Sequence, residues 1–522
     1  MGDSGWDVAD ARRITGLHPL LDGPGVGCEL LGAVDGDRDA VCARLDGIFA
    51  ALGLPAAPVV VRAHSRGLSV ARRAPEDALS VACGALEASL GDGPVDIEVL
   101  RRQLEAEQND ALVALRTALG PGCSFWDDDG FTVGRGVHAR TWPLGALPTL
   151  AVAQAAGGGI PVVMVTGTNG KTTTSRMISS IARAAGRTAG HTSSDGVVVA
   201  GEAVTRGDWT GPGAARTLLR DPRVDFAVLE TARGGLMRRG LAIEGVDAVV
   251  VTNISDDHLC EWGLDDLHDM AWAKLSVARA LRQGGTLVIN GGDDALKQAL
   301  GTALVGRDDI GVRRFGREGD DAWIADGHLM VQEGADVHRL LPVDEVPATL
   351  GGRARFNAEN AMAAVLVARA VGLSLADIRA GLRGFRPTRD QSRGRLNHYT
   401  LPSGASAIVD YAHNPAGVRG FGPVAERHAR VLLLAGQAGD RTDALIDRYA
   451  GALAELSPAV VVIKDLPHYR RGRAPGEVGE RLRRVFERAG VPDIRDVEDE
   501  VEAAAVVLEL AGPGDLCLLF VH

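Results

Sequence analysis

Short apolar runs alternate with helix-like segments along the chain from residue 160 onward. The runs are nearly continuous in apolar residues and read PVVMVTG, DFAVLET, DAVVVTNIS and GTLVING, starting at residues 161, 225, 247 and 285. A strand that is apolar on both sides must be covered on both faces, and a parallel sheet flanked by helices meets that need. The pattern therefore predicts a central α/β domain built on a parallel sheet.

A second, smaller α/β domain is predicted near the C-terminus. The segment GFRPTRDQSRGRLNHY at 384–399 is basic and contains proline, which is typical of a hinge or a crossing between domains. After it, ARVLLLAGQAGDR, AVVVIKDL and DLCLLFVH again have the pattern of buried strands with helices between them. We therefore predict a central domain over 151–392 and a Rossmann-like C-terminal domain over 393–522.

The first 150 residues have a mixed pattern that predicts an α+β domain over 1–150. A strand-like run at 57–73 lies between helix-like segments at 37–53 and 98–120. The block ends in FWDDDGFTVGRG, where Asp129-Gly130 between two β-prone runs predicts a hairpin turn. The acidic triplet 127–129 lacks the spacing of an EF-hand, so turn chemistry is preferred to a calcium site.

Composition narrows the class of protein. A length of 522 residues suggests about three domains. The net charge of −12 argues against a nucleic-acid partner and is compatible with a cationic substrate. The six cysteines form no CxxC pair, the N-terminus has no apolar leader, and no run of about 18 apolar residues occurs. We therefore expect a cytoplasmic protein without a membrane partner, and a homo-oligomer is compatible with these features.

A glycine-rich turn between an apolar strand and a helix predicts a nucleotide site. In TGTNGKTTT the glycines let backbone N–H groups approach phosphate oxygens, and the following helix at 172–186 directs its N-terminus at the anion. The strict GxxxxGK[ST] spacing fails because position 165 is valine, so this is a shortened variant. The residues predicted to bind the phosphates are Gly167, Thr168, Asn169, Gly170, Lys171, Thr172 and Thr173.

Two side chains follow neighbouring apolar runs and are candidate metal ligands. Glu230 ends one run, and His258 lies just beyond the end of another. In open parallel sheets, ligands bind outside the carboxyl ends of the strands, which is also where the phosphate turn lies. Alone, Glu230 could be a helix cap and His258 an ordinary loop residue. Together with a Thr172 hydroxyl on Mg²⁺, they favour sites for divalent ions.

Lysine is scarce in this chain, and that scarcity draws attention to Lys274. Only four lysines occur beside 52 arginines. Lys274 is predicted to lie mid-helix among apolar neighbours, which favours a buried functional role over a solvated one. Reaction with CO₂ would convert its amine into a carboxylate-like metal ligand, and arginine cannot substitute because it keeps its proton.

These residues resemble the Mur ligases and folylpolyglutamate synthetases, and especially the ligase half of cyanophycin synthetases. The resemblance covers about residues 146–522 and rests on GTNGKTTT, LETARGG, TNISDDHL, Lys274, FNAENAMAA, DYAHNPAG, GQAGDR and RRGRAPGEV. The motifs SSDG at 193–196 and GDWTGPGAAR at 207–216 favour the cyanophycin-like branch. The opening RRITGLHPLLDGPGV is more weakly similar to the N-terminal domain of those enzymes.

The resemblance implies roles for individual residues. It implies a magnesium site of Thr172, Glu230, His258 and a carbamylated Lys274, with two ions expected, and makes Lys171, Glu230, His258 and Lys274 the catalytic set. The resemblance also implies a second group of ATP-binding residues: Asn357 and Asn360 at the adenine, Asp410 at the ribose, and Arg395 and His413 closing on the nucleotide.

The implied activity is ATP-dependent amide ligation. A carboxylate attacks the γ-phosphate, ADP leaves, and an amine then displaces phosphate from the acyl phosphate. The resemblance favours a basic amino acid as the amine and an aspartyl- or glutamyl-type small molecule or peptide as the carboxylate. About 150 residues precede the turn, too few for both the N-terminal domain and an ATP-grasp domain, which argues against the usual substrate pair of polyaspartate and arginine.

Three alternatives are weighed against this interpretation. A folylpolyglutamate-type γ-glutamyl ligase would use the same turn, but residues 1–150 fit it poorly. A non-catalytic ATP-binding partner subunit would not need the retained lysines, glutamate and histidine. A switch GTPase or motor lacks support because no NKxD-like element occurs.

Overall fold

The computed structural model describes residues 7–32, 38–91, 93–257 and 259–522. The chain forms two compact units. The first comprises Met1–Ile254, Leu259–Trp323 and Ala363–Ile378, and the second comprises Ser255–His258, Ile324–Met362 and Arg379–His522. The three domains predicted from the sequence stay a prediction, since this division has two parts and other boundaries.

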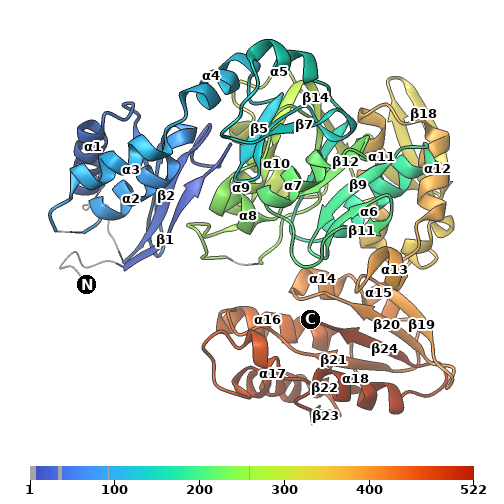
Figure 1. Cartoon of the computed structure of the whole chain (residues 1–522). Coiled ribbons are helices and arrows are strands. Elements are labelled where there is room, and N and C mark those ends of the chain that lie inside the picture. Colours follow the sequence, from blue (N-terminus) through green and yellow to red (C-terminus); the bar gives the residue numbers. More distant parts are fainter. Residues whose placement is uncertain (1–6, 33–37, 92, 258) are drawn as a thin grey trace. The chain divides into compact units, whose positions relative to one another are not determined.

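The N-terminal part of the first unit is an antiparallel sheet covered by helices (Figure 1). Its strand order is β1-β2-β4-β3, so the strand-like run at 57–73 is a hairpin of two strands rather than one. Apolar residues of the strands and helices form one core. The elements are β1 (Asp7–Ile14), β2 (Gly25–Leu31), α1 (Arg38–Leu52), β3 (Val59–His64), β4 (Gly67–Arg73), α2 (Leu79–Ser89) and α3 (Ile97–Glu107).

The helix-like segment at 98–120 is two helices, α3 and α4 (Asp110–Leu119). Gln108 leaves the helical conformation, with φ −59° and ψ 137°. The Asn109 side chain accepts a hydrogen bond from the Leu112 backbone N–H and so caps a new helix. The helical pattern of the sequence continues through the break, so the sequence alone does not reveal this cap.

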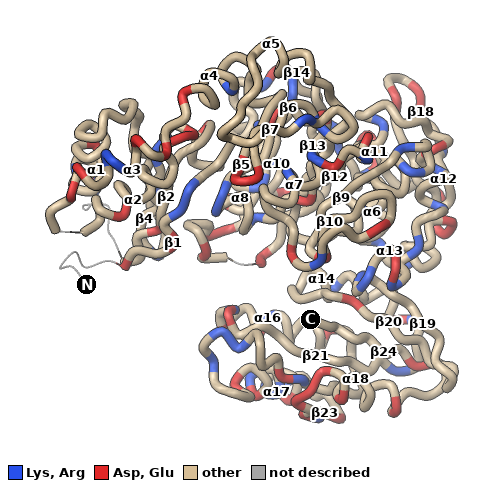
Figure 2. The backbone as a smooth tube through the Cα atoms, viewed as in Figure 1, with Lys and Arg blue, Asp and Glu red and all other residues tan. Residues whose placement is uncertain are grey.

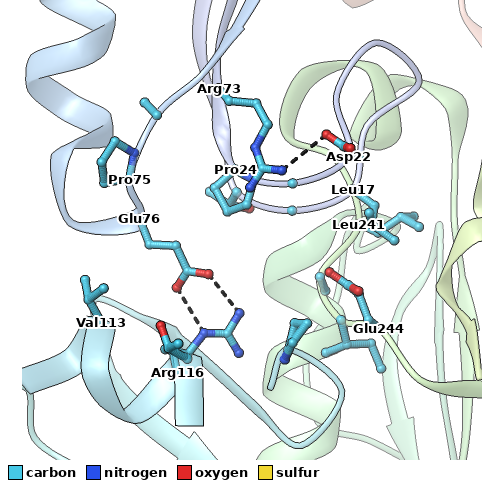
Figure 3. A pocket seen from close by; sticks show the side chains of 18 residues that line it. Leu17, Asp22, Pro24, Arg73, Pro75, Glu76, Val113, Arg116, Leu241 and Glu244 are labelled. Atoms are coloured by element: carbon cyan, nitrogen blue, oxygen red, sulfur yellow. Dashed lines mark hydrogen bonds and ion pairs between the residues drawn. The ribbon is translucent and has the colours of Figure 1, made fainter. Parts of the chain in front are cut away.

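A small three-stranded sheet follows, and it contains the predicted hairpin. β5 (Ser124–Asp127) pairs antiparallel with β6 (Gly130–Val133), and β6 pairs with β7 (Arg140–Trp142). The predicted hairpin is confirmed, with its turn at Asp128-Asp129, one residue earlier than predicted, because Gly130 already pairs with Asp127. Gly130 has φ +135°, which favours glycine. Close by, Arg116 of α4 forms a two-pronged ion pair with Glu76 (Figure 3). Helix α5 (Leu150–Ala156) leads to the main sheet.

The main sheet of the first unit has the order β11-β10-β9-β12-β8-β13-β14-β15-β16. Strands β9, β12, β8, β13, β14 and β15 are parallel to their neighbours in this series, as the continuous apolar runs predict. The strands are β8 (Val162–Thr166), β9 (Ala189–Ser193), β10 (Gly196–Val199), β11 (Glu202–Ala203), β12 (Phe226–Glu230), β13 (Val246–Val251), β14 (Leu281–Asn290), β15 (Gly311–Phe315) and β16 (Ala322–Ala325). The helices are α6 (Lys171–Ala184), α7 (Pro212–Arg220), α8 (Arg233–Arg239), α9 (Leu267–Leu275) and α10 (Asp294–Ala303).

One edge of this sheet differs from a purely parallel one. β9 and β10 are joined by a tight turn and pair antiparallel, and β10 pairs antiparallel with β11. The segment 189–193 reads AGHTS, so this fully buried strand has no apolar run by which the sequence would reveal it.

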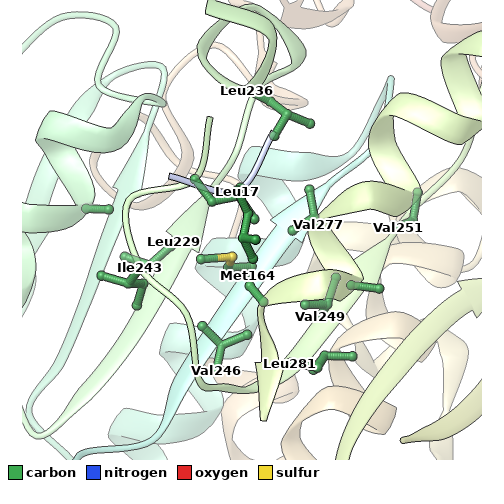
Figure 4. Close-up of a cluster of buried hydrophobic side chains, with 14 of the residues drawn as sticks. Leu17, Met164, Leu229, Leu236, Ile243, Val246, Val249, Val251, Val277 and Leu281 are labelled. Atoms are coloured by element: carbon green, nitrogen blue, oxygen red, sulfur yellow. The ribbon is translucent and has the colours of Figure 1, made fainter. Parts of the chain in front are cut away.

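The core of the first unit joins its sequence-distant parts. Met164 of β8, Leu229 of β12 and Val249 of β13 pack in one apolar cluster (Figure 4). Leu17, from the loop after β1, is 6% exposed and belongs to the same cluster. The loop after β1 is thereby fixed against the sheet that carries the phosphate turn.

The second unit contains a mostly parallel sheet with a core on each face. Its order is β19-β20-β24-β21-β22-β23, and within this sheet's described pairings only β19 is antiparallel to its neighbour. The unit also contains β17 and β18, which pair antiparallel with each other. The strands are β17 (His328–Glu333), β18 (Asp336–Pro342), β19 (Asn397–Thr400), β20 (Ser406–Asp410), β21 (Val431–Ala435), β22 (Val460–Ile463), β23 (Asp493–Asp496) and β24 (Leu516–Phe520). The helices are α13 (Arg389–Ser392), α14 (Pro415–Arg419), α15 (Gly422–Ala425), α16 (Asp443–Glu455), α17 (Glu477–Arg488) and α18 (Glu500–Glu509), with α11 (Arg355–Ala370) and α12 (Leu375–Gly384) contributing to both units.

The observed folds agree with the predicted class: an N-terminal α+β part, a central parallel-sheet α/β part and a C-terminal Rossmann-like α/β part. Basic and acidic residues are interspersed along the chain trace (Figure 2). Among the described residues, no helix combines the length and the apolar character needed to cross a bilayer.

Candidate active site

The predicted phosphate turn connects the carboxyl end of β8 to the N-terminus of α6. Gly167 has φ +143° and Gly170 has φ +84°, both conformations that favour glycine. Gly170 is the N-cap of α6, and no side chain caps that end. The first-turn N–H groups of a helix have no intrahelical partners and carry a partial positive charge. The turn therefore has the geometry of an anion-binding site.

Gly167 also lies too close to the next strand to tolerate a side chain. A Cβ added at this position would lie 1.9 Å from Thr252 Oγ1. The close approach is useful because the Thr252 hydroxyl donates a 2.6 Å hydrogen bond to the Asn169 carbonyl. Glycine at 167 is therefore required both by its backbone conformation and by the packing of the turn against β13.

Residues after β13 hold the turn in place. The Asn253 carbonyl accepts from the Thr168 N–H at 2.8 Å, and its side-chain Oδ1 accepts from the Asn169 N–H at 2.9 Å. Its Nδ2 donates to the Asn169 carbonyl at 3.1 Å. Sequence reasoning gave Thr252 and Asn253 no role in the site, although their position directly after an apolar strand is the signal that marks them.

We predict that Gly167→Ala disrupts this turn. The substitution should lower the free energy of unfolding by roughly 2–4 kcal/mol and weaken ATP binding at least about tenfold, because the backbone and Thr252 must both shift. Thermal unfolding and titration with ATP measure the two effects. Gly186→Ala is the matched control, since Gly186 has φ +79° but open space around a Cβ, so it shares the backbone strain without the clash. Equal effects at the two positions would contradict the prediction.

The Lys171 side chain folds back over the turn. Its Nζ donates to the Gly167 carbonyl at 3.1 Å and to the Thr168 carbonyl at 2.8 Å. These contacts hold the Lys171 amine beside the N–H groups of the turn. Thr173, the last of the predicted phosphate-binding residues, is buried in the first turn of α6.

Thr172 and Glu230 meet at the carboxyl ends of β8 and β12. The Thr172 hydroxyl donates to Glu230 Oε2 at 2.9 Å, and both side chains are buried. The neighbouring β9 supports this position, because Thr192 Oγ1 accepts from the Glu230 backbone N–H at 2.9 Å. Strand pairing fixes the relation, with Glu230 opposite Val165 in the parallel register. The predicted proximity of the two oxygen ligands is thus present in the fold.

Lys274 reaches the same turn from α9. It lies in the last turn of that helix rather than in its middle, because the chain continues as a 3-10 helix from Ser276. Its side chain is buried at 4% exposure, and Nζ lies 3.4 Å from Thr168 Oγ1. The amine is therefore held beside the phosphate turn.

The donor set suits magnesium. Thr172 and Glu230 offer hard oxygen ligands, which Mg²⁺ prefers, and the ion usually completes its shell with substrate phosphates and water rather than with a full protein cage. Within the described residues, no three His, Cys, Asp or Glu side chains converge as a closed metal site. His258, the remaining predicted ligand, lies outside the described residues.

The predicted adenine-binding residues lie in the first two turns of α11. The Asn357 Nδ2 donates to the Ala348 carbonyl at 2.8 Å, and the Asn360 Nδ2 donates to Asn357 Oδ1 at 3.0 Å. Both asparagines are buried. These contacts fix the orientation of the two amides within the second unit.

Arg395, Asp410 and His413 lie near one another around the end of β20. The Arg395 guanidinium is 4.6 Å from the centre of the Tyr411 ring, and Asp410 Oδ2 accepts from the Leu396 N–H at 2.7 Å. Burial raises the pKa of Asp410 above the usual range of an aspartate. The His413 Nδ1 donates to the Tyr411 carbonyl at 3.0 Å, and Nε2 lies 3.2 Å from Asp257 Oδ2.

Comparison with known proteins identifies the family of this chain. The profile of the Mur ligase middle domain matches residues 165–368, and that of the Mur ligase glutamate ligase domain matches residues 394–520. A cyanophycin synthetase of Crocosphaera subtropica is 35% identical over 372 residues, which are 69% of this chain and 42% of the relative. One of Synechocystis sp. is 37% identical over 332 residues, which are 62% of this chain and 38% of the relative.

The chain thus spans about two fifths of the length of the cyanophycin synthetases that it matches. Among solved structures, E. coli FolC in complex with DHPP and ADP is similar with a TM-score of 0.53 at 21% identity. That similarity covers 69% of this chain and 85% of FolC, and it concerns the fold alone. Two consecutive family profiles and the identity to these relatives lead to one assignment: the chain belongs to the Mur ligase family of ATP-dependent ligases.

Proposed function

We propose that this chain forms an amide from a carboxylate and an amine through an acyl phosphate, releasing ADP and phosphate. The observation that carries the proposal is the meeting of Thr172 and Glu230, 2.9 Å apart, beside the Lys171 turn. A cation, an oxygen ligand pair and a helix N-terminus at one sheet edge serve to neutralise a triphosphate. The substrate carboxylate can then approach the γ-phosphate without strong repulsion.

The residues of the first unit have distinct roles in this proposal. Lys171 leaves its carbonyl acceptors and contacts the β- and γ-phosphates, and the backbone N–H groups at 167–173 bind the remaining phosphate oxygens. Thr172, Glu230, His258 and Lys274 hold two magnesium ions. When bound, these ions neutralise phosphate charge and polarise the γ-phosphoryl group. In the second unit, Asn357, Asn360, Arg395, Asp410 and His413 bind the nucleoside.

The proposed substrates are a basic amino acid, arginine or lysine, and an aspartyl- or glutamyl-type carboxylate on a small molecule or peptide. Support comes from the cyanophycin-like motifs and from relatives named cyanophycin synthetase. We further propose that residues 1–150 recognise the carboxylate substrate. Residues 151–392 bind ATP, and residues 393–522 complete the nucleotide site.

A screen of amino-acid and peptide pairs, read by mass spectrometry and nucleotide analysis, tests the proposal. We expect ADP and phosphate to form only when both a carboxylate and an amine are present. Formation of AMP would indicate adenylate chemistry and overturn the mechanism. Equal product from arginine and from a neutral amino acid would overturn the substrate preference. Tight ATP binding with no turnover by any pair would favour a non-catalytic subunit, and glutamate addition to a folate would favour γ-glutamyl ligation.

The carbamate on Lys274 has a test of its own. In the proposed modification the neutral Nζ adds to the carbon of CO₂ and releases one proton, leaving a negatively charged carbamate. We predict that depleting CO₂ lowers ATP turnover at least about tenfold and that bicarbonate restores it, because a metal ligand is lost and regained. Lys274→Arg should be inactive at every bicarbonate concentration, whereas Lys297→Arg, at an exposed lysine, should behave like the parent chain. Turnover independent of CO₂ would contradict the prediction.

A further inference from the structure

A pocket of about 260 Å³ lies between the N-terminal part of the first unit and helix α7. Arg13 and Thr15 line it from the end of β1 and the loop that follows, Gly213 and Arg216 line it from α7, and Arg239 lines it from the end of α8. None of these residues belongs to the proposed catalytic set. The pocket therefore calls for a separate explanation.

Arg216 is a buried cation, and the nearby Asp127 acts on it through space without forming an ion pair. Its side chain is 8% exposed, Nη2 donates to Thr15 Oγ1 at 3.1 Å, and Nε has no hydrogen-bond partner. Among the described residues, no Asp or Glu forms an ion pair with this guanidinium. Burial lowers its pKa to about 10, so the group still carries its charge at neutral pH. An unpaired buried charge is costly, and such groups are normally found where a partner binds.

Three of the four carboxylates that line the pocket have hydrogen-bond partners, and the fourth, Asp128, is exposed and forms no ion pair with Arg216. Glu76 accepts from Arg116 at 2.9 and 3.0 Å (Figure 3). It also accepts from the Trp126 ring N–H at 2.8 Å. Asp127 accepts from Arg220 at 2.6 and 2.9 Å. Glu107 accepts from two backbone N–H groups at the start of α2. None of these carboxylates forms an ion pair with Arg216.

Other features add positive potential to the same space. Arg13 and Arg239 are exposed at the pocket, and neither forms an ion pair with a described residue. Helix α7 begins here, and the partial positive charge of its N-terminus favours an anion. A Cβ placed on Gly213 would meet no atom within 4 Å, so the space beside this helix end is open.

A narrow hollow places this pocket next to the catalytic site. Thr210 and Glu230 line the hollow, and it shares Pro212 and Ala242 with the pocket around Arg216.

We propose that Arg216 and its pocket bind an oxyanion, a carboxylate or a phosphate, carried by a ligand of this protein. The planar guanidinium suits both groups, because its N–H donors match two oxygens at once. This binding site goes beyond the proposed ligase chemistry, and it does not depend on which carboxylate is activated.

Titration calorimetry on the full chain tests the proposal with two probes, glutarate and inorganic phosphate, in separate experiments at low salt. We expect at least one probe to bind with an affinity that falls at least about tenfold in Arg216→Gln, because one charged partner of a desolvated pair is removed. Arg223→Gln is the matched control, since Arg223 is exposed and paired with Asp221 away from the pocket. It should bind both probes like the parent chain.

The outcomes separate the two sources of the oxyanion and separate this site from the phosphate turn. Loss of glutarate binding assigns a carboxylate, and loss of phosphate binding assigns a phosphate. Phosphate bound at the turn would be unaffected by Arg216→Gln, and affinities unchanged for both probes, or no binding by the parent chain, would overturn the proposal. The ligand-free variant should unfold at the same or a higher temperature, because a buried unpaired charge is gone. A lower unfolding temperature would assign Arg216 a structural role and also overturn it. Neither measurement requires turnover, so failure here is distinct from failure of the ligase proposal.

Discussion

Lys171→Met is expected to lower ATP turnover by roughly 10²–10³-fold, the typical loss when one preorganised charge-stabilising group is removed. Lys171 is the ammonium held directly over the phosphate turn, at 2.8 Å and 3.1 Å from two of its carbonyls. Methionine keeps much of the side-chain length but cannot neutralise the negative charge that is shared among the phosphates during transfer. ATP affinity should also fall, because the cation contacts the ground state as well.

Lys297, one of only four lysines in the chain, provides the control for this experiment. Lys297 is exposed and forms an ion pair with Asp294 on α10, so Lys297→Met removes the same charge from the same unit without touching the turn. It should turn over ATP like the parent chain. Turnover is measured as ADP and phosphate released with the best substrate pair from the screen, and ATP affinity by titration. Activity of Lys171→Met within twofold of the control would show that the turn does not act on the transferred phosphoryl group.

The strands and helices that could be predicted from the sequence are those that the local pattern of apolar residues determines. β8, β12, β13 and the second half of β14 follow from continuous apolar runs, because a buried strand leaves no polar face. The first half of β14, with residues 282–284 exposed, lies outside the predicted run. β9 could not be recognised in that way. Its residues Gly190, His191 and Thr192 are buried because helices α6 and α7 pack against the strand, which is a tertiary cause. The break before α4 depends likewise on one Asn109 cap within an unbroken helical period.

In the site, too, some residues can be predicted from local sequence, and others depend on contacts between distant parts of the chain. The phosphate turn is a contiguous sequence, so its glycines, Lys171 and Thr172 could be predicted together. The anchoring of that turn by Thr252 depends on the register of two strands that are far apart in sequence. The pocket at Arg216 depends on contacts among β1, α7 and α8, and no local pattern indicates that a single arginine among 52 will be buried without an ion pair.

Glu230→Gln is expected to raise the Mg²⁺ concentration needed for half-maximal turnover at least about tenfold and to lower the maximal rate roughly 10²-fold. Glutamine has nearly the same shape, and its amide oxygen can still accept the hydrogen bond that the Thr172 hydroxyl donates at 2.9 Å. The substitution therefore removes the negative charge while leaving the packing at the end of β12 in place. A loss of activity with an altered magnesium dependence then reports on the charge that attracts the ion.

Stability separates this effect from damage to the fold. Glu230 is buried, and an amide costs less to desolvate than a carboxylate, so the metal-free variant should unfold at the same or a higher temperature than the parent chain. Glu202→Gln, at an exposed glutamate on β11, serves as the control and should keep the parent magnesium dependence. If Glu230→Gln lowered the rate equally at all Mg²⁺ concentrations, the carboxylate would be acting elsewhere than on the ion. Because Thr172 and Glu230 are the pair on which the ligase proposal depends, that result would remove the magnesium site from the mechanism while leaving the phosphate turn intact.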